Sequence, residues 1–204
     1  MSDIPWAGRA VWRPTGVAIR TVGGGLWRAR YKYDGAVPSP PFVLAANHFS
    51  FLDPPLLAAA FPRPVRFMAL DELLGNHRLL DLVLDTWGVI HVSRANRSIA
   101  GVRTALAHLG GGGSVGLFPE GRRVSRWGEV GFKRGAAWLA VRSGSPLVPA
   151  AVEGSDEVLG IDNRFRPGRL RVRIGEPMLP DPSRPDPVAE LMDRWRAWVT
   201  EALA

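Results

Sequence analysis

The stretch FVLAANHFSFLDP, residues 42–54, joins an apolar run to a histidine and a carboxylate, and the fold can be read outward from it. Along a regular α-helix, the step from His48 to Asp53 turns by about 500°, which leaves the two side chains roughly 140° apart. They can meet only if His48 lies in a strand-to-helix turn and Asp53 lies within the helix. The sequence therefore predicts a strand over 42–46, then a turn that displays a base beside free helix N–H groups.

Strand-like and helix-like segments alternate along the whole chain. This pattern predicts an α/β fold, a single domain whose mostly parallel central sheet is flanked by helices. The length of 204 residues fits one domain, and we expect residues 1–34 to form an N-terminal segment before a main domain over 35–204. Further strands are predicted over 28–33, 65–70, 88–93, 115–118, 147–152 and 169–174, and helices over 54–60, 71–84, 96–109, 133–142 and 187–203.

Composition narrows the classes of partner. The net charge is +7, and 24 of the 26 basic residues are arginine, a planar cation that binds phosphate through two parallel hydrogen bonds. Nucleic acid, an anionic membrane and a phosphorylated metabolite all fit this charge. The chain has no cysteine, and therefore no disulfide, thiolate nucleophile or cysteine metal site, which is compatible with the cytoplasm. No apolar run is long enough for a transmembrane helix, and no signal-peptide pattern opens the chain.

The segment 1–34 mixes tryptophans with arginines. One interpretation is a surface segment whose tryptophans dock on the core. The other is a membrane-apposed element, with Trp6 and Trp12 at headgroup depth and arginines toward anionic lipid. The glycines at 23–25 predict that no single long helix runs through this region.

Several patterns are set aside. The glycines of 110–116 match a dinucleotide fingerprint and a nucleophile elbow, but both need a strand before them and a helix after them. Here the predicted order is reversed, so a helix-terminating linker is expected. The histidines have no metal-ligand spacing, and we expect no metal. Alternating arginines over 169–173 predict a solvated strand face, with an anionic lipid or acidic carrier protein as the alternative. Nucleic acid is not expected there, because no aromatic residues are interleaved.

Charged side chains recur where predicted strands end. Arg94 follows the strand 88–93, and Glu120, Gly121 and Arg123 follow the strand 115–118. Lys133 opens a later helix. In parallel α/β sheets the ligand crevice lies at the carboxyl ends of the strands, so one crevice can hold Arg94 and Arg123 with His48.

These blocks, in this order, resemble the glycerolipid acyltransferase family, of the 1-acylglycerol-3-phosphate acyltransferase type. The family pattern is NHxSxxD, then Gly-x-Ile-x-x-x-Arg, then FPEGTRS, then a V-P-V/I strand, and the resemblance runs from about Tyr33 to Pro177. Three positions depart from it: Arg122 stands in place of threonine, Val124 in place of serine and Asn76 in place of proline.

The resemblance implies that residues 35–204 are an acyltransferase domain with His48 and Asp53 as its catalytic pair. His48 would remove the acceptor hydroxyl proton, and Asp53 would fix its tautomer and stabilise the imidazolium. Ser50 is interpreted as structural, since the substrate supplies the attacking hydroxyl. Arg94 and Arg123 would bind the acceptor phosphate, with Lys133 as a further candidate and Glu120 and Gly121 shaping the acceptor pocket.

The implied reaction moves a fatty acyl group from acyl-CoA or acyl carrier protein to a lysophospholipid, without a metal or prosthetic group, at the cytoplasmic face of an anionic inner membrane. Two alternatives stay open. The same chemistry on a different lipid or specialised metabolite is suggested by Arg122. A non-enzymatic module for anionic lipid or nucleic acid is suggested by the charge alone.

Overall fold

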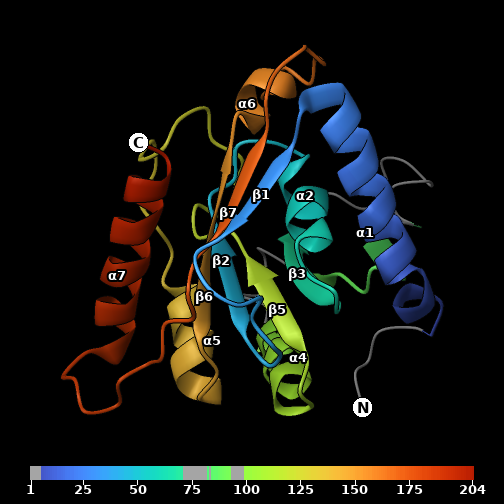
Figure 1. The fold of residues 1–204 in the computed structure, drawn as a ribbon. Helices are drawn as coiled ribbons and strands as arrows, with labels where there is room; N and C mark the ends of the chain where they lie inside the picture. Colours follow the sequence, from blue (N-terminus) through green and yellow to red (C-terminus); the bar gives the residue numbers. More distant parts are fainter. Residues whose placement is uncertain (1–5, 71–81, 83, 93–98) are drawn as a thin grey trace.

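The computed structural model describes residues 6–70, 82, 84–92 and 99–204. Within these residues the strands form one seven-stranded sheet with helices on both faces (Figure 1). The strands are β1 (Arg30–Tyr33), β2 (Val43–Ala46), β3 (Val65–Leu70), β4 (Ile90–Val92), β5 (Ser114–Leu117), β6 (Leu147–Glu153) and β7 (Arg171–Ile174). The helices are α1 (Trp6–Trp27), α2 (Asp53–Ala59), α4 (Ile99–Gly110), α5 (Gly135–Ser143), α6 (Ser155–Val158) and α7 (Pro187–Ala202).

The sheet order is β1-β7-β6-β2-β5-β3-β4, and among the described residues only β6 and β7 pair antiparallel. This confirms the predicted α/β class with a mostly parallel sheet. Strands β6, β2, β5, β3 and β4 all run in one direction. Their carboxyl ends therefore meet at one edge of the sheet, where a ligand crevice is expected.

Two hydrophobic cores lie on opposite faces of this sheet. Helices α1 and α2 cover one face, while α4, α5 and α7 cover the other. Successive residues of a strand point to opposite faces, so β2 contributes Leu44 and Ala46 to the first core and Val43 and Ala45 to the second. Burial on both faces explains why β2 is apolar throughout.

The glycine-rich linker behaves as predicted. Helix α4 ends at Gly110 and β5 begins at Ser114, so a helix precedes the glycines and a strand follows them. Gly112 has a φ of 81°, a left-handed conformation that glycine adopts without steric cost. The predicted helix over 71–84 lies for the most part outside the described residues.

The glycines at 23–25 do not interrupt α1, so the prediction of a break was wrong. Two glycines of this helix face close neighbours. A Cβ on Gly16 would lie 3.6 Å from the Ala59 Cα of α2, and one on Gly23 would lie 3.3 Å from the Ala29 Cβ. Glycine costs a helix about 1 kcal/mol per residue relative to alanine. Here the close packing of α1 on the domain outweighs that local preference.

The N-terminal segment is joined to the domain by α1 and β1. The indole N–H of Trp12 donates to the Phe61 carbonyl oxygen at 3.0 Å, and its ring contacts Trp87 at a centroid distance of 5.4 Å. Trp12 is only 4% exposed, so for this residue the first interpretation, docking on the core, is confirmed, and the alternative position at headgroup depth is wrong. Strand β1 pairs in parallel with β7. In the described part of the chain, no helix combines the length and the apolar character that crossing a bilayer requires.

Candidate active site

The histidine and the carboxylate meet as the opening geometry requires. His48 lies in the turn between β2 and α2, and Asp53 is the first residue of α2. The His48 Nδ1 atom lies 3.0 Å from the Asp53 Oδ2 atom. The Asp53 side chain is fully buried, whereas the His48 side chain retains 16% exposure. The structure therefore confirms the predicted contact and leaves the imidazole open on one side.

The Asp53 carboxylate is fixed by the backbone of the same turn. Its Oδ2 atom also accepts hydrogen bonds from the backbone N–H groups of Phe49 and Ser50, each at 2.7 Å. Because Oδ2 already accepts from two N–H groups, it also acts as an acceptor toward the imidazole, which assigns the proton between the pair to Nδ1 of His48. The Nε2 atom then carries the lone pair and can act as a base.

Residues after β5 hold the ring and backbone of His48. The Phe118 ring stacks on the imidazole at a centroid distance of 4.0 Å and an interplanar angle of 18°. The His48 N–H donates to Glu120 Oε1 at 3.1 Å, and the His48 carbonyl oxygen accepts from the Val124 N–H at 2.9 Å. The segment 118–124 therefore limits the movement of His48 on three sides.

Glu120 is a buried carboxyl beside the pair. It is 4% exposed, and its Oε2 atom has no hydrogen-bond partner among the described residues. Burial is the main cause that raises the pKa of Glu120 to about 7; the nearby charge of Asp53 adds to the rise, and two backbone hydrogen bonds oppose it. A neutral form is therefore accessible near neutral pH. The role of Glu120 as a support for the His48 backbone had no signal in the sequence.

Two polar residues of the turn tie it to the strand and loop beyond. The Ser50 Oγ atom donates to the Leu159 carbonyl oxygen at 2.6 Å and accepts from the Leu52 N–H at 3.1 Å, which agrees with a structural role. The Asn47 amide donates to the Val152 carbonyl oxygen and accepts the Val152 N–H, both at 2.8 Å. Asn47 thus continues the pairing of β2 with β6 by one step and fixes where the turn begins.

Arg123 lies on the same side of the turn. Its guanidinium carbon sits 3.6 Å from the Phe51 ring centroid, and its Nη1 atom donates to Asn163 Oδ1 at 3.0 Å. Partial burial lowers the pKa of Arg123, and the charge of Asp53 counteracts this. Sequence reasoning missed Phe51 and Asn163. Phe51 occupies a variable position of its motif, and no spacing rule connects residue 163 with residue 123.

The other predicted ligands have different outcomes. A Cβ on Gly121, whose φ is 68°, would collide with the Lys133 side chain, so Lys133 passes directly over this glycine. Arg94 lies outside the described residues. Arg122, the departure from the family pattern, forms an ion pair with Glu129 at 3.0 Å and is half exposed.

Two other features stand apart from the turn. A cavity of about 570 Å³ lies between the 128–134 loop and α7, and none of the predicted site residues line it.

The alternating arginines of β7 are ion-paired: Arg171 with Glu153 at 2.9 Å and Arg173 with Asp34 at 3.0 Å. Among the described residues, no group of three or more histidine, aspartate or glutamate side chains is placed to hold a metal.

Comparison with known proteins gives a consistent result. The family model described as Acyltransferase matches residues 29–153, more than half of the chain. The 1-acyl-sn-glycerol-3-phosphate acyltransferase of Bacillus subtilis is 33% identical over 138 residues, covering 67% of this chain and 66% of that protein. The alpha form from Ovis aries is 34% identical over 165 residues, covering 78% of this chain and 56% of that protein. The chain thus spans less than two thirds of the length of these relatives.

A solved structure supports the fold. The crystal structure of the 1-acyl-sn-glycerophosphate (LPA) acyltransferase from Thermotoga maritima superposes with a TM-score of 0.75. The match covers 94% of this chain and 79% of the other at 22% sequence identity. At this identity the likeness establishes the shared α/β fold.

Proposed function

The chain belongs to the acyltransferase family, and from that membership we propose that it transfers a fatty acyl group from a thioester donor to the free hydroxyl of a lysophospholipid. The reaction would serve phospholipid synthesis. The observation that carries the proposal is the contact between His48 and the buried Asp53, with Nε2 of the imidazole free to accept a proton. The printed activity of the relatives, acylation of 1-acyl-sn-glycerol-3-phosphate, supports the choice of acceptor.

The chemistry requires only the pair and the two substrates. Nε2 of His48 takes the acceptor hydroxyl proton as the oxygen attacks the thioester carbonyl carbon. The ester C–O bond forms, the C–S bond breaks, and the departing thiolate takes the proton back from the imidazolium. Asp53 stabilises that imidazolium through the bond to Nδ1 and holds the ring in one orientation. Transfer is direct, since the only hydroxyl in the turn, that of Ser50, is occupied by two hydrogen bonds.

Arg123 is proposed to bind the acceptor phosphate, together with Lys133 and Arg94. The guanidinium is held over Phe51 by a neutral oxygen of Asn163, so its positive charge stays available to an anion. Glu120 and Gly121 would complete the acceptor side of the site. A different lipid or a specialised metabolite as acceptor is the second candidate, first suggested by Arg122. Arg122 forms an ion pair with Glu129, so its charge is already neutralised, and this argues against a role for Arg122 in choosing the acceptor.

The donor is proposed to be acyl-CoA or acyl-acyl carrier protein, and the protein to act as a peripheral enzyme on the cytoplasmic face of an anionic membrane. No prosthetic group is needed for the steps above. The net charge of +7 supports an anionic surface. Nucleic acid is not proposed as a partner.

The test is release of free thiol from acyl-CoA and from acyl carrier protein, with and without lysophosphatidic acid. We expect release that depends on the acceptor, and a fall of at least about 10²-fold in kcat for His48→Ala with an unchanged circular dichroism spectrum. The matched control is His91→Ala, which removes a histidine from strand β4 at the end of the sheet and should leave turnover unchanged.

Each outcome decides a separate point. Absence of thiol release with both donors would reject the acyl transfer. Equal turnover of a phosphorylated acceptor and its unphosphorylated analogue would favour the second candidate. Retained turnover in His48→Ala would reject the proposed base.

A further inference from the structure

At one end of the molecule several apolar side chains are more than half exposed. At the C-terminal end of α1, Leu26 is 66% exposed, and Val22, one helical turn earlier, is 51% exposed. On the neighbouring 160–169 loop Phe165 is also 66% exposed. The two segments lie side by side, because the Trp27 and Phe165 rings stack at a centroid distance of 5.9 Å. Figure 1 shows this pair of segments at the apex of the ribbon.

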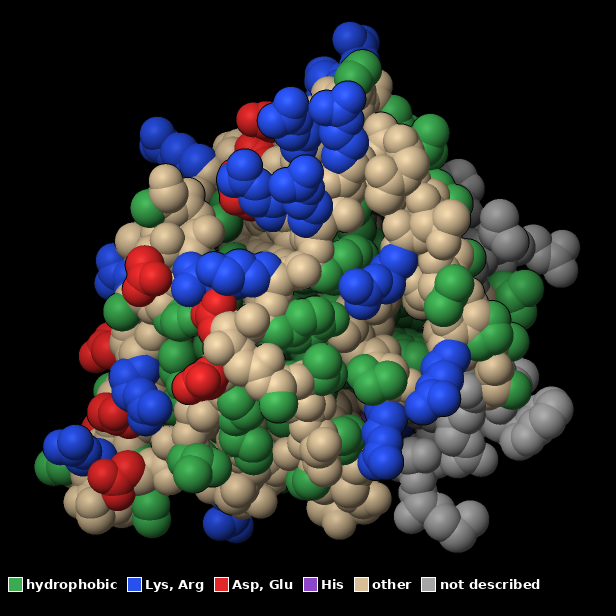
Figure 2. Space-filling view, viewed as in Figure 1, with side chains coloured by type: hydrophobic (Ala, Val, Ile, Leu, Met, Phe, Trp, Pro, Cys, Tyr) green, Lys and Arg blue, Asp and Glu red, His purple; other side chains and the backbone are tan. Residues whose placement is uncertain are grey.

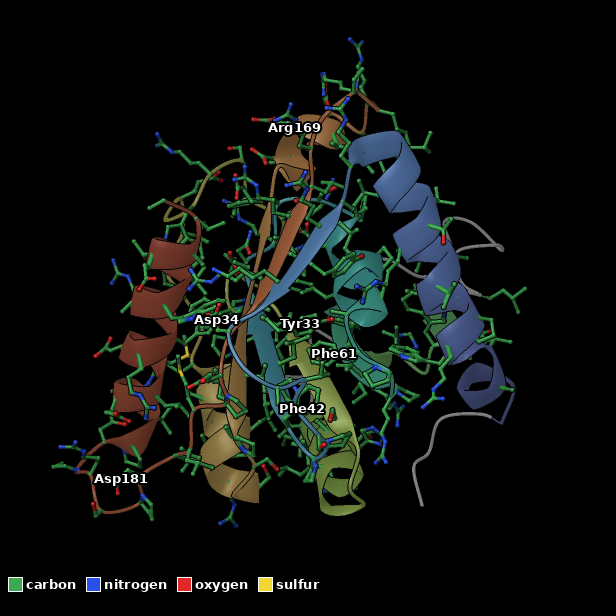
Figure 3. The ribbon with its side chains drawn as sticks, viewed as in Figure 1. Tyr33, Asp34, Phe42, Phe61, Arg169 and Asp181 are labelled. Carbon is green, nitrogen blue, oxygen red and sulfur yellow. The ribbon has the colours of Figure 1, made fainter. Side chains whose placement is uncertain are left out.

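Unpaired arginines surround these apolar tips. Arg28, Arg164 and Arg169 are exposed, and none of them forms an ion pair with another described residue. Two of the nearby acidic groups are ion-paired, Asp162 with Arg166 and Glu153 with Arg171. Figure 2 shows Lys and Arg side chains gathered at this end, and Figure 3 places Arg169 there. We call the set Val22, Leu26, Arg28, Arg164, Phe165 and Arg169 the apical ridge.

The apical ridge adjoins the candidate active site. The loop that carries Phe165 begins after Leu159, whose carbonyl oxygen accepts the Ser50 hydroxyl hydrogen bond. Farther along this loop Asn163 accepts the hydrogen bond from Arg123. The ridge and the site therefore share one loop at the carboxyl ends of the strands.

We propose that the apical ridge is the surface through which the protein docks on an anionic bilayer. Leu26 and Phe165 enter the interface between headgroups and acyl chains, while the arginines bind anionic headgroups. A convex ridge with isolated apolar tips suits a fluid bilayer, whereas a folded acidic partner such as a carrier protein needs a concave or flat surface to match. The proposal rests on the proposed function in one respect: docking through the ridge would deliver a lipid acceptor to the neighbouring candidate active site.

The test is co-sedimentation with vesicles of phosphatidylcholine, with and without phosphatidylglycerol. It uses protein carrying His48→Ala, so that binding is read without turnover. We expect stronger binding to the anionic vesicles. Leu26→Asp and Phe165→Asp should each lower the partition coefficient about tenfold. The matched control is Leu179→Asp, since Leu179 is 67% exposed and lies two residues from Asp181 at the opposite end in Figure 3.

A second set of variants tests the charges. Replacement of Arg28, Arg164 and Arg169 together by Glu should lower binding to anionic vesicles by more than about tenfold, and Arg142→Glu on α5 should not. Equal binding by Leu26→Asp, Phe165→Asp and Leu179→Asp would overturn the proposal. Binding to acyl carrier protein that is lost in the ridge variants, without vesicle binding, would overturn it as well.

The two proposals fail separately. Thiol release with a short-chain, water-soluble lysophosphatidate in the absence of vesicles tests the function alone, and Leu26→Asp should retain it. If wild-type protein shows no such release but the vesicle results hold, the ridge stands and the acyl transfer does not.

Discussion

At the scale of single residues, the turn between β2 and α2 concentrates three hydrogen bonds on one oxygen of Asp53. Two of them come from the backbone and fix the carboxylate, and the third fixes the imidazole of His48. Asp53→Asn keeps the size of the side chain but removes its charge and brings N–H donors to a site that needs acceptors. We expect kcat to fall by about 10³–10⁴-fold, because the imidazole would adopt the wrong tautomer.

The measurement for Asp53→Asn is thiol release, with thermal unfolding as the control for the fold. Asp85→Asn, at an exposed position before β4, is the matched substitution and should change neither quantity. A kcat within about threefold of wild type for Asp53→Asn would contradict the assigned role, since a tautomer error affects every turnover.

Asn163 is predicted to position Arg123 for an anionic acceptor. Its Oδ1 atom accepts a hydrogen bond from the guanidinium without neutralising it. Asn163→Asp would form an ion pair that competes with the phosphate. We expect KM for a phosphorylated acceptor to rise about tenfold at unchanged kcat, and KM for the unphosphorylated analogue to stay the same.

Asn163→Ala separates position from charge in the same assay. It frees Arg123 to move but leaves its charge available, so KM should rise less than in Asn163→Asp. Equal effects of both variants on the two acceptors would show that Asn163 supports only the loop.

Glu120 is predicted to make the free energy of unfolding fall as the pH rises. Its pKa is about 7 in the folded protein against 4.5 for an ordinary glutamate, so between these values the folded state binds more protons than the unfolded state. The free energy of unfolding must therefore fall as the pH rises through this window. Above about pH 7, where Glu120 is ionised in both states, the loss reaches its full size, on the order of 3 kcal/mol. Glu120→Gln keeps an acceptor for the His48 N–H and has nothing to ionise.

The check on Glu120 is urea unfolding at pH 5 and at pH 7.5 for both proteins. The loss of stability between the two pH values should be smaller in Glu120→Gln than in wild type, with a difference approaching the order of 3 kcal/mol. An identical pH dependence would mean that Glu120 ionises in the fold as easily as in water.

At the residue scale, the sequence predicted the contact between His48 and Asp53 but not the residues that hold the site residues in place. His48 and Asp53 could be paired because helix geometry permits only one local solution. Phe118 over the imidazole, Glu120 beneath its backbone and Asn163 beside Arg123 depend on how distant loops pack. No periodicity or spacing in the chain encodes that packing.

At the scale of elements, α1 shows where local propensity fails. Its glycines predict a break, but Gly16 and Gly23 allow the helix to lie close to the residues around α2. Trp12 then fills the core and donates to the Phe61 carbonyl oxygen. Strands were predicted better, because strands such as β2 and β6 are buried on both faces and are largely apolar in sequence.

Trp12 is predicted to anchor α1. Trp12→Ala removes a buried indole and leaves a cavity, so the free energy of unfolding should fall by about 3–5 kcal/mol. Val17→Ala is the control on the same helix, where a side chain that is 64% exposed should change stability by less than about 0.5 kcal/mol. Urea unfolding measures both. A Trp12→Ala protein as stable as the control would contradict the role of Trp12 as an anchor of α1.

At the scale of the whole molecule, alternation of strand and helix was sufficient to predict the α/β class, and the strand ends predicted that the turn after β2 meets the segment after β5 at one edge of the sheet. The order of strands was not predictable, because β1 and β7 join the sheet beyond β6 through pairings that no local pattern specifies. The pairing of β6 with β2 matters for the candidate site, since it places the loop after β6 beside the turn that carries His48.

The two cores share the central strands β2 and β6, and this predicts that both layers of helices unfold together. Val43 and Leu44 are neighbours in β2 yet belong to opposite cores, so neither core can open while the other keeps the strand. Trp195 of α7 is fully buried and donates to the Ala45 carbonyl oxygen at 2.9 Å. Trp195→Ala should therefore destabilise both layers by the same amount, about 3–5 kcal/mol, in spite of lying in only one.

Hydrogen exchange measured peptide by peptide in increasing urea tests this coupling. Peptides from α2 on one face and α7 on the other should lose protection at one urea concentration, in wild type and in Trp195→Ala alike, with the midpoint lowered equally for both in the variant. Loss of protection in α7 while α2 remains protected would show that the layers are independent. In that case the turn after β2 could stay folded without the second core. The claim that the whole sheet supports the candidate site would then be wrong.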